Sequence, residues 1–442
     1  MSNTPTLQSI KDLYKSVFYI EDDNIIDIIL SITIASKLPG DPIWLLIIGG
    51  SSSGKSELIN MLNKIPFVFP ISSMTENSFL SSMKTNNGED PSLLHRIGTS
   101  GMITMKDYTS ILSMRSEKRE LIVSQMREIF DGKLDKVAGN GNSQYWEGKI
   151  NWIGAVTDSI YIKEGESAGM GRRTINYIMP QQDRRATTKR ASANTGDISE
   201  KRTLIQDAVA KFVEHKINTL PKKLPIISEE DDAMLIELAD FITQARTPVE
   251  RDFRENIILV PDFEMPMRVY SMFQKMLQTM IHISDDQQVT EEHRKALIGL
   301  AFDSIPKQII LPLKVLARHK AVTTKGIAQD LNYPSETVLK WLQNINVTQI
   351  CDRRQIELGK PDMWVMRDQY KDLICKYLNI TPVNELLVDP DTEEEGSGTD
   401  INPSWMNKSD WGTDDPVEAR EREEASIKQF DMFINELKED DK

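Results

Sequence analysis

Cysteine and histidine are scarce in this 442-residue sequence, and their scarcity excludes several kinds of protein. Two cysteines, Cys351 and Cys375, are too few for a disulfide framework or a cysteine-rich zinc site. The five histidines are scattered without the spacing of metal ligands. No run of about twenty apolar residues is present, so we expect no membrane span. The first residues also lack the basic and apolar regions of a signal peptide. We therefore expect a soluble protein of the cytoplasm.

Basic residues are outnumbered, but the excess of acid is confined to one end of the chain. The net charge is −14, yet residues 388–442 alone hold 18 Asp and Glu against 6 Lys and Arg, a balance of −12. The rest of the chain is therefore almost neutral and can present basic faces to nucleic acid. The composition of the acidic tail is typical of disordered segments.

Residues 49–56 match the phosphate-loop pattern G-x-x-x-x-G-K-[ST] at every fixed position. The apolar run 44–48 predicts a buried strand before the loop, and residues 57–63 predict a helix after it. In such a loop the backbone N–H groups surround a polyphosphate, the lysine reaches the β- and γ-phosphates, and the last hydroxyl holds Mg²⁺. We therefore expect ATP and Mg²⁺ to bind here, with Ser56 as a metal ligand, at Gly49, Gly50, Ser51, Ser52, Ser53, Gly54, Lys55 and Ser56.

Asp107 ends a second strand-like run, residues 101–107, and is the candidate for a carboxylate that coordinates Mg²⁺. The alternative role is a helix N-cap, because a helical pattern starts three residues later. In many ATPases a glutamate follows this aspartate and activates the attacking water, but Tyr108 occupies that place here. Glu76 or Glu128 would have to supply the base instead.

Three further residues suit contacts with the γ-phosphate. Thr157 ends the third apolar run, residues 150–157, where a hydroxyl can hydrogen-bond the attacking water; a plain strand-to-loop transition is the alternative. Arg172 and Arg173 directly precede a strand-like segment, and the rigid fork of arginine suits a phosphate held by a neighbouring subunit. Ordinary surface arginines at the start of a strand are the alternative reading.

The alternation of apolar runs and amphipathic segments predicts an α/β fold with a parallel sheet. We divide the chain into an N-terminal helical segment (1–40), a nucleotide-binding core (41–182), a linker with a helical region (183–303), a compact module (304–380) and an acidic, largely disordered tail (381–442). The polar and basic stretch 184–197 is expected to be a loop or linker.

Three segments carry narrower signals. Residues 127–149 predict a helix and then a β-hairpin with a Gly-Asn-Gly-Asn turn, directly before the third strand. Residues 261–268 lead into a methionine-rich helical stretch, with Pro266 suited to its first turn. Residues 320–366 predict a helix, a tight turn, a second helix and two strands, in the order of a winged helix.

Taken together, residues 20–370 resemble AAA+ ATPases of the replicative helicase type encoded by phages and mobile elements. The layout is similar to that of minichromosome-maintenance and superfamily 3 helicases. The resemblance implies a P-loop AAA+ core with a helical lid and a C-terminal winged helix, working in a ring that is most often a hexamer. It also implies a bacterial or phage-infected host cell.

The resemblance assigns roles to particular residues. The hairpin would grip single-stranded DNA in the pore through Lys133, Lys136 and Lys149; a plain surface hairpin is the alternative. Arg268 would be the sensor-2 arginine, or else a surface arginine that begins a core helix. The second helix and the wing would contact duplex DNA through Lys340, Arg353 and Arg354, although winged helices also serve as protein-docking modules.

The leading hypothesis from the sequence is thus an ATP-dependent motor that moves along DNA, a replicative helicase. A nucleotide-dependent DNA-binding switch or helicase loader is the first alternative, favoured by the missing glutamate after Asp107. A regulatory or defence ATPase is the second. The acidic tail would mimic DNA, bind replication proteins, or only solubilise the chain.

Overall fold

The computed structural model describes residues 4–83, 87, 89–137, 143–161, 173–194, 196, 198–259, 262–354, 362–383 and 385–387. Residues 388–442 lie outside these residues. Residues 386–387, which the sequence assigned to the largely disordered tail, instead form a short strand. Within the described part, no single helix is long and apolar enough to cross a membrane. Two helices joined by a 113° bend, α12 (Glu291–Asp303) and α13 (Lys307–Arg318), reach that length and composition only when taken together.

Five parallel strands form the central sheet, as the alternating pattern predicted. Their order across the sheet is β2 (Val68–Ile71), β3 (Ser100–Met105), β6 (Lys149–Val156), β1 (Trp44–Ile48) and β7 (Ile175–Ile178). Every residue of β1 is buried, as expected of an apolar run in the middle of a parallel sheet. The sheet is therefore compatible with a P-loop α/β core.

Because the strands are parallel, all of them start along one side of the sheet and end along the opposite side. Trp44 pairs with Trp152 at the start of β1, and Ile48 pairs with Val156 at its end. The three segments that follow β1, β3 and β6 consequently emerge along one edge, which we call the carboxyl edge. The starts of β1, β6 and β7 lie along the opposite, amino edge. Four residue steps along β1 separate the two edges by about 13 Å.

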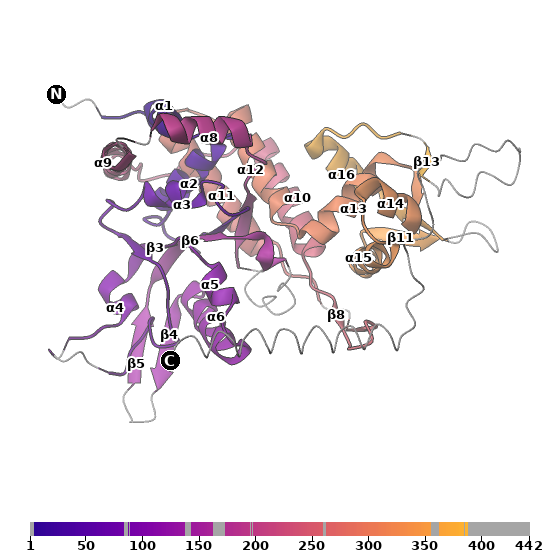
Figure 1. Cartoon of the computed structure of the whole chain (residues 1–442), viewed down its shortest axis with the longest axis horizontal. Coiled ribbons are helices and arrows are strands. Elements are labelled where there is room, and N and C mark those ends of the chain that lie inside the picture. The colour runs from indigo at the N-terminus through magenta and orange to yellow at the C-terminus, as the bar shows by residue number, and fades with distance from the viewer. Residues whose placement is uncertain are drawn as a thin grey trace, which may run out of the picture. The chain divides into compact units, whose positions relative to one another are not determined.

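Helices from the N-terminal segment and from residues 198–303 pack beside the sheet (Figure 1). The apolar helix α2 (Asn24–Ala35) contacts α11 (Met267–Ser284), whose Met272, Met276 and Met280 are buried core residues. Next to them, α12 packs on β7. The remaining helices of this region are α1 (Leu7–Val17), α9 (Ile198–Asn218) and α10 (Glu229–Ala245).

The expectation of a loop at residues 184–197 is wrong, because this stretch contains the helix α8 (Arg184–Ala193). Asp183 caps it, accepting hydrogen bonds from the backbone N–H groups of Arg185 and Ala186. No residue of α8 is buried. A helix without an apolar face leaves no hydrophobic periodicity in the sequence, which is why the pattern suggested a linker.

A β-hairpin stands directly before β6, as predicted from the sequence. Strands β4 (Lys133–Val137) and β5 (Ser143–Glu147) pair antiparallel, and the residues of the turn lie outside the described ones. The hairpin follows α6 (Ser116–Phe130) and packs beside α4 (Leu93–Ile97), where the indole Nε1 of Trp146 donates to the carbonyl of Gly98 at 2.7 Å.

A second, shorter hairpin joins α10 to α11. Its strands are β8 (Glu250–Arg251) and β9 (Ile257–Leu259). The guanidinium of Arg251 donates to the side chains of Gln343 and Asn344. This hairpin is thereby fixed to the C-terminal module.

Between residues 320 and 366, the described part of the C-terminal module has two helices followed by two strands, as the sequence predicted. After α13 come β10 (Ala321–Thr323), α14 (Thr324–Leu331), α15 (Ser335–Val347), β11 (Cys351–Arg354), β12 (Met363–Met366), α16 (Asp368–Leu378) and β13 (Leu386–Leu387). Its four strands form a sheet in the order β11-β12-β10-β13. Two short helices thus precede an antiparallel β11–β12 pair.

Candidate nucleotide site and neighbouring surfaces

The phosphate loop connects β1 to the short helix α3 (Lys55–Asn60) at the carboxyl edge. Two glycines are required by geometry. A Cβ on Gly49 would lie only 2.9 Å from Cβ of Met179, and Gly54 has φ of +90°, a conformation that favours glycine. Ser52 also has a positive φ, of 63°. The loop is therefore curled tightly, as a backbone cradle for an anion requires.

Lys55 lies along this loop. Its ammonium donates to the carbonyls of Gly49 at 2.7 Å and Gly50 at 2.5 Å, and the residue is only 8% exposed. Burial lowers the pKa of Lys55, while the charges of Asp158 and Asp107 act in the opposite direction. Both carboxylates therefore lie within electrostatic reach of the lysine.

Asp107 occupies the carboxyl edge immediately after β3 and is exposed. Its carboxylate accepts from the backbone N–H of Thr109 at 3.0 Å, just before α5 (Thr109–Leu112), whose N-cap residue is Tyr108. The second oxygen of the Asp107 carboxylate can coordinate a cation. No group of three or more His, Cys, Asp or Glu within the described residues could hold a metal. A magnesium ion at Asp107 and Ser56 would thus need phosphate oxygens to complete its shell.

Thr157 lies between the phosphate loop and Asp107, because β6 lies between β1 and β3. Its hydroxyl is bonded to Ser159 at 2.7 Å and lies 3.4 Å from the hydroxyl of Thr109. A contact of Thr157 with a γ-phosphate stays a prediction.

Asp158 is a residue that the sequence interpretation passed over. It follows Thr157, begins the short 3₁₀ helix Asp158–Ile160, and is exposed. Its charge affects Lys55 more strongly than that of Asp107. The sequence does show a carboxylate directly after the hydroxyl residue that ends the strand. Asp158 lies near Lys55, however, only because β6 is the neighbour of β1.

Tyr108 cannot replace the expected glutamate. Its side chain is only 2% exposed, and its hydroxyl has no hydrogen-bond partner in the described part of the chain. Burial raises its pKa far above the ordinary value, so it stays protonated. It therefore has no basic form with which to activate water near neutral pH.

The two proposed substitutes for that glutamate lie elsewhere. The carbonyl of Glu76 accepts from Lys136 of the β4–β5 hairpin at 2.9 Å, which places this residue beside the hairpin. Glu128 is exposed on the last turn of α6, next to Phe130, whose ring packs against Trp44 at the amino edge with centroids 5.2 Å apart. Of the acidic residues considered, Asp107 and Asp158 alone are shown near Lys55.

Arg173 and Arg268 meet at the amino edge. Their guanidinium carbons lie 5.9 and 5.5 Å from the centre of the Phe130 ring. Arg173 also pairs with Asp131 at 2.8 Å. Both arginines lie at the opposite end of the strands from the phosphate loop of their own chain, a separation of about 13 Å along β1. Arg172 lies outside the described residues.

The three hairpin lysines have different environments. Lys133 is 66% exposed and 3.7 Å from Glu147 on the facing strand, and Lys149 is 48% exposed and 3.9 Å from Asp41. By contrast, the ammonium of Lys136 donates to the carbonyls of Glu76 and Leu80 and to the side chain of Asn77. Lys136 thus fixes the hairpin to the segment after β2.

The C-terminal candidates all have carboxylate partners. Lys340 on α15 lies 3.4 Å from Glu255 of the β8–β9 hairpin, Arg353 is paired with Asp362, and Arg354 lies 3.7 Å from Asp352. All three side chains are still about half exposed, between 46% and 62%. Any phosphate would have to compete with these ion pairs.

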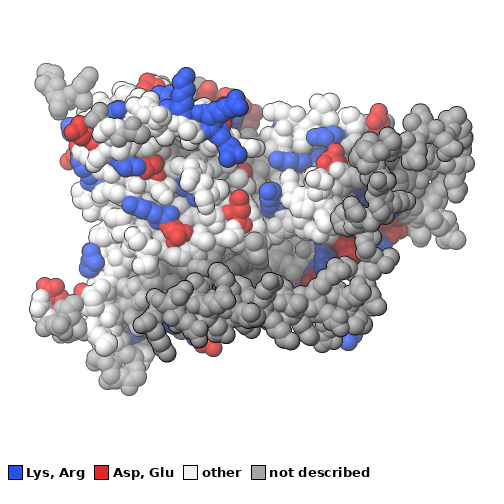
Figure 2. All heavy atoms as spheres, viewed as in Figure 1, with Lys and Arg blue, Asp and Glu red and all other residues white. Residues whose placement is uncertain are grey.

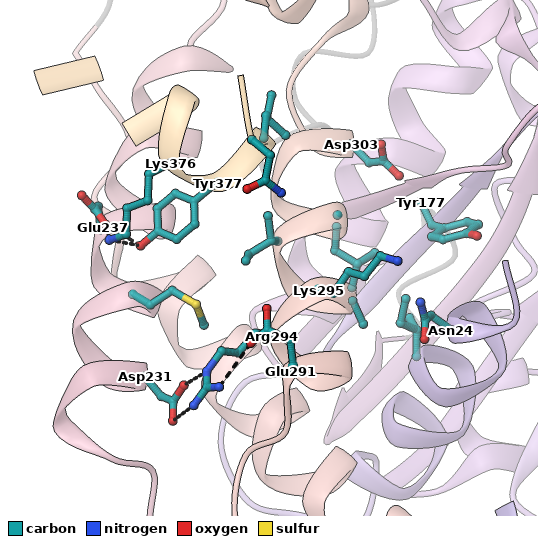
Figure 3. Close-up of a pocket in the computed structure, with 18 of the residues that line it drawn as sticks. Asn24, Tyr177, Asp231, Glu237, Glu291, Arg294, Lys295, Asp303, Lys376 and Tyr377 are labelled. Atoms are coloured by element: carbon teal, nitrogen blue, oxygen red, sulfur yellow. Dashed lines mark hydrogen bonds and ion pairs between the residues drawn. The ribbon is translucent and has the colours of Figure 1, made fainter. Parts of the chain in front are cut away.

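A hollow of about 1140 Å³ lies between the end of β7, α10, α12 and the end of α16. Figure 3 shows Arg294 paired with Asp231 and Glu291, and Lys376 beside Tyr377 and Glu237. On its floor, Asp303 accepts from the backbone N–H of Ile178, and burial raises its pKa to about 7. No phosphate-loop residue lines this hollow, so it does not define the nucleotide site.

Comparisons with known proteins add no identification. No protein-family model matches the chain, and a search of curated proteins gives no match either. The functional interpretation therefore depends on the geometry above.

Proposed function

We propose that this protein is an ATPase that moves along DNA, a replicative helicase of the AAA+ type. The observation that carries the proposal is the carboxyl-edge cluster. A tightly curled glycine-rich loop holds Lys55, and two carboxylates from the two neighbouring strands lie within its electrostatic reach. In the proposed complex the loop N–H groups and Lys55 bind the triphosphate, and Ser56 and Asp107 hold Mg²⁺. Asp158 orients or activates the attacking water.

Arg173 and Arg268 support assembly into a ring. They lie at the edge opposite to their own phosphate loop, around one phenylalanine ring. A head-to-tail contact brings the amino edge of one chain to the carboxyl edge of the next and closes a ring if the rotation permits. Each ATP would then lie between Lys55 of one chain and arginines of its neighbour, the arrangement of an arginine finger in trans.

The DNA contacts in this proposal come from two places. The β4–β5 hairpin offers Lys133, and the start of β6 beside it offers Lys149, to a strand in the pore, while Lys136 holds the hairpin in position. The module 304–380, with two short helices before an antiparallel strand pair, is proposed to be a winged helix. Its helix α15 would contact duplex DNA. Lys340 would then leave its ion pair with Glu255 and bind a DNA phosphate instead.

ATP turnover with and without single-stranded DNA tests the proposal. We expect single-stranded DNA to stimulate ATP turnover by the parent chain. The Lys55→Ala variant should lose this turnover. Lys64→Ala is the matched control, because Lys64 follows the same helix but pairs with the exposed Asp207 at 2.6 Å. Absence of ATP hydrolysis by the parent chain under all conditions would rule out the motor.

A nucleotide-dependent DNA-binding switch or helicase loader is the second candidate, and the buried, permanently protonated Tyr108 favours it. A forked duplex separates the two candidates. The motor unwinds it in an ATP-dependent reaction that Lys55→Ala abolishes, whereas the switch binds DNA more tightly with ATP and releases no single strand.

A further inference from the structure

Helix α8 is a basic surface helix that the proposed ATPase site does not use. Figure 2 shows Lys and Arg side chains gathered on the face of the molecule over this helix. Four cations and no acidic residue occur between residues 184 and 194. They are Arg184, Arg185, Lys189 and Arg190.

The orientation of α8 separates these four cations into two groups. The guanidinium of Arg190 donates to the carbonyl of Ser16 at 3.3 Å, so this residue faces α1. With about 100° between successive residues, Lys189 and Arg185 lie about 100° and 140° around the helix from Arg190 in one direction, and Arg184 lies about 120° from it in the other direction. All three therefore point away from the side that faces α1. All three are exposed. Within the described part of the chain, none of them has a carboxylate partner.

This arrangement is unfavourable for the helix itself. A ten-residue helix with no buried residue gains little from packing. Like charges four residues apart, as at Arg185 and Lys189, destabilise a helix further. The helix is held mainly by its Asp183 cap and by Asn194, whose side chain donates to the carbonyl of Val17 at 3.0 Å. A local conflict of this kind is expected where a surface serves a ligand.

We propose that the exposed face of α8 binds the phosphate backbone of nucleic acid. Three unpaired cations within two helical turns match successive phosphates, and no hydrogen-bonding pattern for bases is needed. A membrane surface fits less well, because α8 has no apolar residue larger than alanine with which to enter the interface. The ligand class follows from the proposed function, but the contact itself does not require ATP hydrolysis.

The position of α8 connects this surface to the nucleotide site. Met179, five residues before α8, packs against Gly49 of the phosphate loop. After α8, Arg202 of α9 forms a two-pronged ion pair with Glu57 of α3, at 2.9 and 2.5 Å. Nucleic acid bound to α8 would therefore contact a segment joined at both ends to the phosphate loop and its helix, on the carboxyl edge and away from the hairpin.

The test measures binding of labelled oligothymidine, without nucleotide, over a range of salt concentrations. The full chain is compared with the triple variant Arg184→Gln, Arg185→Gln, Lys189→Gln. Each lost phosphate contact on a single strand makes the slope of log K against log salt shallower by about 0.7, hence roughly 2 for three contacts. The same relation gives a loss of affinity of up to about 100-fold near 0.1 M salt.

The matched control is Lys222→Gln, Lys223→Gln, Lys307→Gln, which removes the same charge from exposed positions elsewhere. We expect its slope to equal that of the parent, and circular dichroism to be the same for both variants. Equal losses of DNA affinity in the two variants would mean that the effect comes from net charge alone, and would overturn the proposal. Unchanged binding by the α8 variant would overturn it as well.

Two further measurements identify the partner of α8 and its dependence on ATP. A peptide of residues 388–442 tests the acidic tail: if the α8 variant loses the peptide but keeps DNA, the partner is the tail and the proposal is wrong. Lys55→Ala tests independence from the motor. We expect it to bind DNA like the parent, so a failure of the proposed ATPase function would leave the α8 result standing.

Discussion

Mixing two variants that are each expected to be inactive tests whether each proposed ATP site is shared between chains. The first variant, Lys55→Ala, loses the phosphate-loop lysine but keeps both amino-edge arginines. The second, Arg268→Ala, keeps the phosphate loop. Arg268 is preferred to Arg173 here because it is 33% exposed and its nearest carboxylate, Glu264, is 3.6 Å away, so its removal leaves the packing largely intact.

The expected magnitude follows from the geometry. Arg268 stacks on Phe130 at the amino edge, and about 13 Å of β1 separates that edge from Gly49. If the arginine acts only on a neighbour, a random equal mixture leaves about a quarter of the interfaces with both a native lysine and a native arginine. Turnover should then recover to about a quarter of the parent rate if sites work independently, and to less if they are coupled around the ring.

The assay requires mixed rings, so the two variants are co-expressed with different affinity tags and purified through both. Turnover of that sample is compared with each variant alone and with doubly tagged parent protein. Recovery in the mixed rings and none in the separate variants is the expected result. No recovery in rings shown to contain both chains would mean that Arg268 acts within its own chain or not on ATP, and the placement argument would fail.

Three further outcomes are expected. A Cβ at Gly49 would lie 2.9 Å from a methionine side chain, so Gly49→Ala should cost about 1–3 kcal/mol in thermal denaturation, while Gly50→Ala, with nothing within 4 Å, should not. The raised pKa of Asp303, about 7, means that its stabilising protonated form is lost as pH rises from about 4 through 7. Asp303→Asn should therefore gain stability relative to the parent between pH 5 and pH 8, by at most roughly 3 kcal/mol in denaturant titrations; a constant difference would contradict this. Asp131→Asn should keep basal ATP turnover and DNA affinity but lose DNA stimulation, whereas the exposed Asp135→Asn should keep all three; equal behaviour of the two would exclude a coupling role for Asp131.

Local chemistry was predictable from the sequence, and relations across the fold were not. The phosphate loop occupies eight consecutive residues, so its strand, turn and helix could be found from pattern alone. The hairpin before β6 was likewise predicted from a local turn sequence. Asp158 was missed because its proximity to Lys55 depends on β6 lying next to β1 in the sheet. More than ninety residues separate these two strands in the sequence.

Side-chain partners were the least predictable feature. Lys136 looked like a free cation, but its ammonium is held by oxygens of the segment after β2. Lys340 looked exposed on its helix, but the β8–β9 hairpin brings Glu255 to it. In both cases the partner comes from a distant part of the sequence, and no periodicity records it.

In the proposed motor, the amino edge connects the phosphate of a neighbouring chain to the β4–β5 hairpin. Arg173, proposed to sense a neighbour's phosphates, is paired with Asp131. The next residue, Gly132, has φ of +96°, and its carbonyl accepts from the N–H of Gly148 at 2.9 Å. These two glycines form the base of the β4–β5 hairpin, which begins at Lys133. A movement of Arg173 when the neighbouring phosphate leaves would therefore act on the hairpin through a single ion pair and one backbone hydrogen bond.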